Sequence, residues 1–131
     1  MRYFIRISFL GNNYCGWQIQ PGQISVQETI EKCISNLTKE KITIVGAGRT
    51  DSGVHATNMY AHFDTKNSIE KKGFLTRINL YLPKDISMHE ILPVKDKSHA
   101  RFDAISRTYK YFINQNKDPF KIDQSYFCKF E

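Results

Sequence analysis

Paired cysteines are missing from this sequence of 131 residues. The three cysteines, Cys15, Cys33 and Cys128, lie far apart and form no Cys-x-x-Cys pair. Such spacing argues against a disulfide scaffold and a structural zinc site, and it favours a reducing, cytoplasmic setting. The four histidines have no metal-ligand spacing with these cysteines, so we expect no metal site.

Long apolar runs are missing as well. No segment approaches the roughly 20 apolar residues of a membrane span, and the first residues lack the apolar stretch of a signal peptide. The sequence also contains no repeat, low-complexity tract or internal linker. We therefore expect no membrane association and a single domain over residues 1–131, which is long enough to bury a sizeable core.

Acidic residues are outnumbered by basic ones. Nineteen Lys and Arg stand against thirteen Asp and Glu, which gives a formal net charge of +6. This excess suits a polyanionic partner, because each phosphate that a Lys or Arg neutralises releases counterions. The same charge also fits a protein that binds no nucleic acid and is kept in solution by repulsion.

The clearest elements are a first strand and the helix that follows it. Apolar residues alternate over residues 2–10, which predicts a strand with one mainly apolar face. Ser25 and Glu28 form a capping box, in which each side chain can bond the other's backbone N–H. One apolar stripe then recurs at helical spacing: Val26, Ile30, Cys33, Ile34 and Leu37. We expect Glu28, Glu31 and Lys32 on the solvated face of this helix.

Shorter patterns complete the fold. Further strands are predicted over residues 41–45, 58–63, 86–94 and 106–114. Residues 67–80 are ambiguous, because Ser68 could cap a helix that Gly73 then interrupts, and Pro83 ends that element. Strands mixed with one or two helices predict an α+β fold, a mostly antiparallel sheet with helices packed on one face.

The most informative segment is the glycine-rich loop, residues 46–56, which reads Gly-Ala-Gly-Arg-Thr-Asp-Ser-Gly-Val-His-Ala. It follows a β-branched run that reads as a buried strand. Its glycines let the backbone turn sharply and a partner approach closely, and between them lie one cation, Arg49, and one carboxylate, Asp51. A strand-end loop that presents an acid beside a base is a common place for chemistry. The pattern also fits a solvated surface turn.

Five segments in a fixed order carry a family resemblance. They are Tyr14-Cys15-Gly16-Trp17-Gln18, Ser25-Val26-Gln27-Glu28, Gly48-Arg49-Thr50-Asp51-Ser52-Gly53-Val54-His55-Ala56, Leu82-Pro83-Lys84-Asp85-Ile86, and His99-Ala100-Arg101-Phe102-Asp103-Ala104 with Arg107-Thr108-Tyr109-Lys110-Tyr111. The set resembles the motifs of the tRNA pseudouridine synthase A family over essentially the whole chain. Five ordered motifs are far more specific than one.

The resemblance implies an isomerase that converts uridine to pseudouridine in the anticodon stem-loop of tRNA, at tRNA positions 38–40. It also implies a two-lobed fold, of which residues 1–131 form the amino-terminal half with the catalytic loop, while the carboxy-terminal half is absent from this chain. Family members act as homodimers with tRNA lying across both subunits. The reaction needs no metal or redox cofactor.

By resemblance, Asp51 is the catalytic carboxylate, acting either as a nucleophile or as a base on the sugar. Arg49 would hold the target nucleotide out of its helix, and its plainer alternative is a salt bridge to Asp51. Tyr109 would stack on the uracil and exclude water. A strand tyrosine packed in the core is the commoner case for such a residue.

Three further basic residues, Arg101, Arg107 and Lys110, are candidates for RNA phosphate contacts, and each is equally compatible with a surface charge. His55 is expected to be a hydrogen-bonded loop histidine rather than a general base. Met59 stands where the family usually has Gln, which removes any polar support from that position.

The missing half matters for the chemistry. In the family it supplies a basic residue that pairs with the catalytic carboxylate and an apolar residue that lines the uracil pocket. Without the basic partner Asp51 would lose a favourable neighbour. The 131-residue chain alone is therefore expected to fold but to be catalytically weak or inactive.

Other functional classes fit less well. Asp51-Ser52-Gly53 occurs in aspartic proteases, but those have an apolar strand directly before the Asp, where this chain has Gly48-Arg49. A dinucleotide-binding loop would need Gly at position 51, and a Gly-Lys-Ser/Thr motif is absent. The serious alternative is a non-catalytic, basic RNA-binding α/β module, because nine Phe, seven Tyr and one Trp offer many stacking surfaces.

Overall fold

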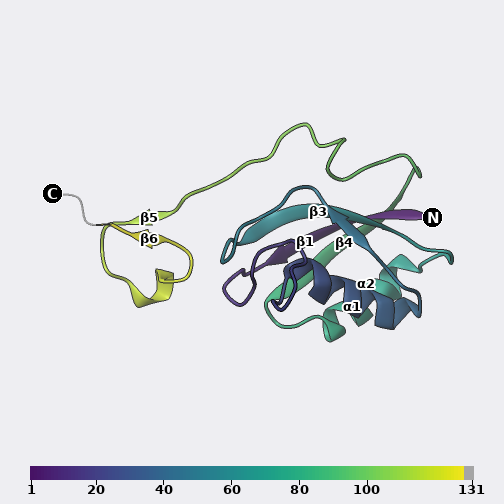
Figure 1. Ribbon diagram of the computed structural model, residues 1–131, viewed down its shortest axis with the longest axis horizontal. Helices are drawn as coiled ribbons and strands as arrows, with labels where there is room; N and C mark the ends of the chain where they lie inside the picture. The colour runs from purple at the N-terminus through teal and green to yellow at the C-terminus, as the bar shows by residue number, and fades with distance from the viewer. Residues whose placement is uncertain (129–131) are drawn as a thin grey trace.

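A four-stranded antiparallel sheet with both helices against one face forms the body of the molecule (Figure 1). The computed structural model describes residues 1–128. The sheet has the order β2-β3-β1-β4. Its elements are β1 (Arg2–Phe9), α1 (Val26–Thr38), β2 (Ile44–Gly46), β3 (Ala56–Asp64), α2 (Lys71–Tyr81) and β4 (Ile86–Val94). The predicted α+β class is confirmed.

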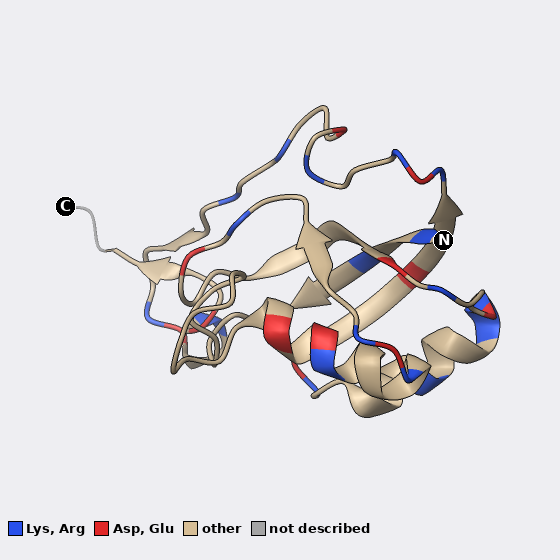
Figure 2. Ribbon diagram, turned by 45° about the vertical axis from the view of Figure 1, so that its right-hand side comes forward, with Lys and Arg blue, Asp and Glu red and all other residues tan. Residues whose placement is uncertain are grey.

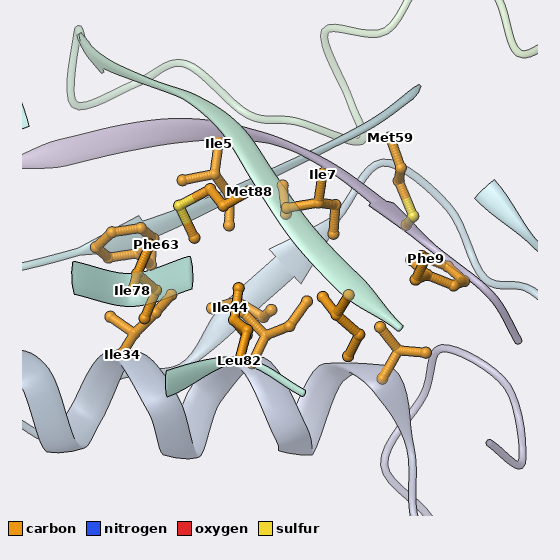
Figure 3. Close-up of a cluster of buried hydrophobic side chains, with 14 of the residues drawn as sticks. Ile5, Ile7, Phe9, Ile34, Ile44, Met59, Phe63, Ile78, Leu82 and Met88 are labelled. Carbon is orange, nitrogen blue, oxygen red and sulfur yellow. The ribbon is translucent and has the colours of Figure 1, made fainter. Parts of the chain in front are cut away.

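The core lies between the sheet and the two helices. Burial alternates along β1 as predicted, since Tyr3, Ile5, Ile7 and Phe9 are buried and the residues between them are not. Figure 3 shows Ile5, Ile7 and Phe9 in one cluster with residues of the other strands and of both helices, among them Ile34 and Ile78. Each large apolar side chain buried here contributes roughly 1.5–3 kcal/mol, so the sheet is a rigid base for its loops.

Helix α1 starts where the capping box predicts, but only half of the box forms. The Ser25 hydroxyl oxygen accepts the backbone N–H of Glu28 at 3.1 Å. The Glu28 carboxylate instead pairs with Lys32, one turn further on, at 3.1 Å. A neighbouring cation one turn away competes successfully for this carboxylate.

The ambiguous segment before Pro83 is a helix, α2, and Gly73 lies within it. The predicted cap at Ser68 is wrong, because the helix begins at Lys71 with Glu70 at the N-cap and no side-chain cap bond. The chain entering α2 is fixed from the core, since Ile69 donates its N–H to the Tyr3 hydroxyl at 2.9 Å. A long-range bond thus positions the chain just before the helix, which itself has no side-chain cap.

The strand predicted over residues 106–114 is wrong for most of its length. Only β5 (Ile113–Asn114) is a strand, paired in parallel with β6 (Tyr126–Phe127) beyond the short 3₁₀ helix η1 (Pro119–Lys121). Residues 106–111 pair with no strand within residues 1–128 and leave the body as an extended segment (Figure 1), whereas the carbonyl of Phe112 accepts the N–H of Tyr126 in β6. Alternating side chains cannot make a strand without a neighbouring backbone to complete the ladder.

Before it leaves the body, the chain crosses the sheet face opposite the helices. The Arg2 guanidinium donates to the Ser98 carbonyl at 2.7 Å, and the Ala100 N–H donates to Nδ1 of buried His62 at 3.0 Å. These two bonds fix the segment around residues 98–103 on β1 and β3. No helix within residues 1–128 has the length and apolar character needed to cross a membrane.

Candidate active site

The glycine-rich loop joins edge strand β2 to β3, so both of its ends are fixed by the sheet. The N–H of Ala47 donates to the Tyr60 carbonyl at 2.8 Å and continues the ladder past β2. Further on, the N–H of Val54 donates to the Asp51 carbonyl at 3.2 Å and closes a turn. Gly53 in that turn has φ of +80°, which glycine adopts without strain. The loop therefore has a defined shape.

A second loop, residues 11–17, holds the centre of the glycine-rich loop. The N–H of Trp17 donates to the Thr50 carbonyl at 3.2 Å. Gly16 has φ of +119°, and a Cβ at this position would lie only 2.4 Å from the same carbonyl oxygen. Only glycine therefore lets the two loops approach this closely.

Tyr14 fixes the other side of the same contact. The hydroxyl of Ser52 donates to the Tyr14 carbonyl at 3.3 Å. The Tyr14 ring is buried, and its hydroxyl donates to Oδ1 of Asp85 at 2.7 Å. Burial, together with this hydrogen bond, raises the pKa of Tyr14 well above its usual value. The residues before and after Asp51 are thus both bonded to the 11–17 loop.

Trp17 and Met59 form an apolar floor where β2 ends. Both side chains are buried, and a Cβ at Gly46 would lie 2.6 Å from the Trp17 ring and 2.7 Å from the Met59 methyl carbon. Met59 therefore supports the glycine-rich loop by packing, at the position where the resemblance led us to look for a polar side chain.

Asp51 itself is exposed. Within residues 1–128 its carboxylate makes no hydrogen bond to another side chain and no ion pair. The salt bridge to Arg49, the alternative to a substrate role for that arginine, therefore does not form there. An exposed carboxylate on a backbone fixed at both flanks can meet a substrate without first breaking an internal bond.

Arg49 and Arg101 are brought together at a shallow hollow of about 160 Å³ beside the loop. Its other lining residues come from β2, α1, the glycine-rich loop and the end of the 11–17 loop with the residue that follows it: Trp17, Gln18, Gln27, Ile44, Val45, Gly46 and Gly48. A pocket that encloses a small molecule usually measures roughly 300–1,000 Å³. The hollow is too small and open to enclose a nucleotide without further walls.

Arg107 also reaches the loop. Its Nε donates to the Ala47 carbonyl at 2.8 Å and its Nη2 to the Arg101 carbonyl at 3.0 Å. The other two candidates on this segment, Tyr109 and Lys110, are exposed, and neither side chain forms a hydrogen bond to the loop. The structure therefore joins Arg107 to the site directly and leaves Tyr109 and Lys110 outside it.

His55 lies at the end of the loop and is hydrogen-bonded through both ring nitrogens. Nδ1 accepts the N–H of Gly11 at 2.8 Å, so the proton of the neutral ring is on Nε2, which contacts the carbonyl of Asp123. This geometry fits the expected hydrogen-bonded loop histidine.

The sequence did not identify Gln27 and Glu31 as residues that support β2. The prediction that Glu31 lies on the solvated face is wrong. Its carboxylate accepts the N–H of Ile44 at 2.9 Å, and burial raises its pKa. Gln27 donates to the Ile44 carbonyl at 2.9 Å and accepts the Ile19 N–H at 3.1 Å. Edge strand β2 needs such partners because its outer backbone groups face no other strand. The available signal for this role was the spacing of four residues between Gln27 and Glu31, which places both side chains on one face of the helix.

The basic side chains are widely distributed rather than confined to this site. Figure 2 shows Lys and Arg on the helices, on the sheet and along the segment after β4, with acidic positions between them. Within residues 1–128, no group of three or more His, Cys, Asp or Glu side chains is placed to hold a metal ion.

Comparisons with known proteins show which family the chain is similar to. A family described as tRNA pseudouridine synthase matches residues 5–103. A tRNA pseudouridine synthase A of Azobacteroides pseudotrichonymphae is 52% identical over 128 residues, which is 98% of this chain and 51% of that protein. The enzymes of the same description from Parabacteroides distasonis and Acinetobacter baumannii are 50% and 51% identical, over 95% and 86% of this chain and 50% and 43% of their own lengths. The chain thus spans about half the length of these relatives.

Proposed function

The chain belongs to the tRNA pseudouridine synthase family, and from this premise we propose that it is the amino-terminal half of an enzyme that converts uridine to pseudouridine in tRNA. The observation that carries the proposal is the exposed Asp51 carboxylate, on a loop whose backbone is bonded to the sheet and to the 11–17 loop on both sides of that residue.

The reaction requires an acid group close to the ribose. The N1–C1′ glycosidic bond breaks, the uracil turns, and a bond forms between C5 and C1′, while C5 releases a proton and N1 takes one up. Asp51 supports this exchange either by attacking C1′ as a nucleophile or by removing a proton from the sugar. Both routes need the carboxylate beside the ribose. Because the atoms of the substrate are only rearranged, no external oxidant or reductant enters the balance.

Arg49 and Tyr109 complete the substrate contacts of this half. Arg49, two residues before Asp51, lines the hollow beside the loop and is proposed to hold the target nucleotide out of the RNA stack, which costs a few kcal/mol. Tyr109 is 63% exposed, so its ring is available to stack on the released uracil.

The second half of the protein is proposed to close the site. The hollow beside the glycine-rich loop, which Arg49 lines, is open and small, so the remaining walls of the uracil pocket and a basic partner for the carboxylate must come from elsewhere. The proposed substrate is the anticodon stem-loop of tRNA at tRNA positions 38–40, bound by a homodimer of the full-length protein. The net charge of +6 and the exposed side chains of Arg101 and Lys110 favour such a polyanion.

The test is an Asp51→Asn substitution in the full-length protein, with Asp96→Asn as the matched control at another exposed loop position. The amide keeps the shape of the carboxylate but neither attacks C1′ nor accepts a proton effectively. Asp51→Asn should abolish pseudouridine formation on unmodified tRNA and leave the Kd for tRNA within about twofold, whereas Asp96→Asn should leave both unchanged. Pseudouridine formation by Asp51→Asn at the wild-type rate would refute the proposal.

The non-catalytic RNA-binding module is supported by a separate observation. Aromatic side chains along the segment after β4 are exposed: Phe102, Tyr109, Tyr111, Phe112, Phe120, Tyr126 and Phe127. Exposed rings on a basic chain bind single-stranded RNA by stacking alone. Tight tRNA binding by the wild-type full-length protein without any pseudouridine formation would favour this function.

A further inference from the structure

The side chain of Arg107 bridges two backbone carbonyls that lie far apart in the sequence. Nε donates to Ala47 in the glycine-rich loop at 2.8 Å, and Nη2 donates to Arg101 at 3.0 Å. The guanidinium group is planar and rigid, so one side chain fixes both carbonyls in a single geometry. Within residues 1–128 it forms no ion pair with a carboxylate.

Both ends of this bridge rest on the sheet. The N–H of Ala47 is already bonded to the Tyr60 carbonyl in β3, so the bond from Arg107 to the Ala47 carbonyl holds the second backbone polar group of the same residue. Arg101 follows Ala100, whose N–H is bonded to buried His62, also in β3. Arg107 therefore ties the start of the glycine-rich loop to a segment that is itself anchored on the same strand.

Gly48 makes the bridge sterically feasible. A Cβ at position 48 would lie 3.3 Å from Nε and 3.5 Å from Cδ of Arg107. The first of these distances is tighter than an ordinary contact, so a methyl group would require the guanidinium to move by a few tenths of an ångström. The backbone of Gly48 has no positive φ, so its conformation is open to other residues and the missing side chain serves this close approach.

We propose that Arg107 is a positioning residue for Asp51 and Arg49, acting through the glycine-rich loop and not through an RNA phosphate. The inference rests on the proposed function. The loop is bonded to the 11–17 loop at Thr50 and Ser52, and Arg107 provides the matching restraint at Ala47. Loss of that restraint lets Arg49 and Asp51 shift together. A shift of about 1 Å in a reacting group costs on the order of 100-fold in rate.

The test compares Arg107→Lys with Arg77→Lys in the full-length protein. Lys keeps the positive charge but has one compact ammonium group, which cannot hold both carbonyls in a planar fork. Arg77 is an exposed residue on α2, so its replacement is a control for the chemical change alone. For Arg107→Lys, kcat for pseudouridine formation should fall roughly 10- to 100-fold, with Kd for tRNA and its salt dependence within about twofold of wild type.

Gly48→Ala should reproduce part of the kcat loss, because the added methyl group strains the bridge, and combining it with Arg107→Lys should add little. Arg107→Gln removes the charge as well, and for this variant a phosphate contact predicts the opposite pattern: weaker tRNA binding and a salt slope reduced by about one, with kcat unchanged. That pattern, or additive losses in the double variant, would overturn the proposal.

Amide hydrogen exchange separates this inference from the proposed function. Exchange at residues 47–50 of the full-length protein should be at least tenfold faster in Arg107→Lys than in wild type or Arg77→Lys. This readout is independent of any enzymatic activity. A wild-type protein that forms no pseudouridine would refute the proposed function, and unchanged exchange at residues 47–50 would refute the bridge.

Discussion

The hydroxyl of Tyr14 donates to Oδ1 of Asp85 at 2.7 Å and joins two segments that lie 71 positions apart in the sequence. Asp85 precedes β4, and its carbonyl also accepts the N–H of Leu10 at the end of β1. The pair thus fastens the 11–17 loop to the edge of the sheet. Because the carbonyl of Tyr14 receives the Ser52 hydroxyl, the position of Asp51 depends on a contact on the far side of that loop.

Replacing Tyr14 with Phe tests this support. The substitution removes one charge-assisted hydrogen bond from a buried ring, so the free energy of unfolding should fall by about 1–2 kcal/mol. Urea denaturation at neutral pH measures the change. Tyr81→Phe is the control, because Tyr81 is 59% exposed on α2, and it should stay within about 0.5 kcal/mol of wild type. Equal stability of the two variants would show that the Tyr14 bond contributes nothing.

Gly16 and Gly22 form a matched pair for the contact between the two loops. Both have positive φ, +119° and +74°, so alanine is strained at each. A Cβ at Gly22 would meet nothing within 4 Å, whereas at Gly16 it would collide with the Thr50 carbonyl. Gly22→Ala should lower the free energy of unfolding by about 1 kcal/mol. Gly16→Ala should lower it by about 3 kcal/mol or more and should also reduce kcat. The comparison requires urea denaturation and pseudouridine assays on both variants, and similar losses would argue against close loop packing.

Local patterns in the sequence were enough to predict the body of the fold. The alternation along β1, the stripe of α1 and the span of β4 follow from which residues must leave water, and each is confirmed. The glycine-rich loop was also found, because its glycines and its acid and base are contiguous. Such features depend on neighbours in sequence.

The errors concern contacts between distant residues. Glu31 has a helical position that looks solvated. Its carboxylate nevertheless accepts the backbone N–H of Ile44 in edge strand β2, which has no neighbouring strand on that side. Residues 106–112 alternate like a strand, but alternation does not reveal whether a partner backbone is present. The bridge from Arg107 to Ala47 spans 60 positions, and no local pattern distinguishes it from a surface charge.

His62 makes the stability of the protein depend on pH. Burial, followed by the charges of Arg2 and His99, lowers its pKa to about 4, and Nδ1 must stay unprotonated to accept the Ala100 N–H. An unfolded histidine has a pKa near 6.5, so between these values the unfolded chain binds more protons. Stability is therefore complete above about pH 6.5 and declines towards pH 4, by at most about 1.4 kcal/mol per pH unit.

Urea denaturation of wild type and His62→Gln between pH 4 and 8 measures this contribution. The variant should lose the slope between pH 4 and 6.5, while His89→Gln, at an exposed histidine on β4, should keep it. The Arg2 guanidinium holds the pKa of Asp64 below its usual value, and that carboxylate affects stability only at lower pH, below about 4. An unaltered slope in His62→Gln would assign the effect to other groups.

The isolated 131-residue chain should release little or no tritium from tRNA that carries 5-tritiated uridine. Release reports loss of the C5 hydrogen when the base rejoins the sugar, so it follows the isomerisation directly. Asp51 is exposed here, and the hollow beside its loop is too small to enclose a nucleotide. Water therefore competes for the site, and the cleaved uracil has no closed pocket in which to turn. We expect less than about one hundredth of the kcat of the full-length protein. A rate close to that of the full-length protein would mean that residues 1–131 contain a complete active site and that a second half contributes no catalytic group.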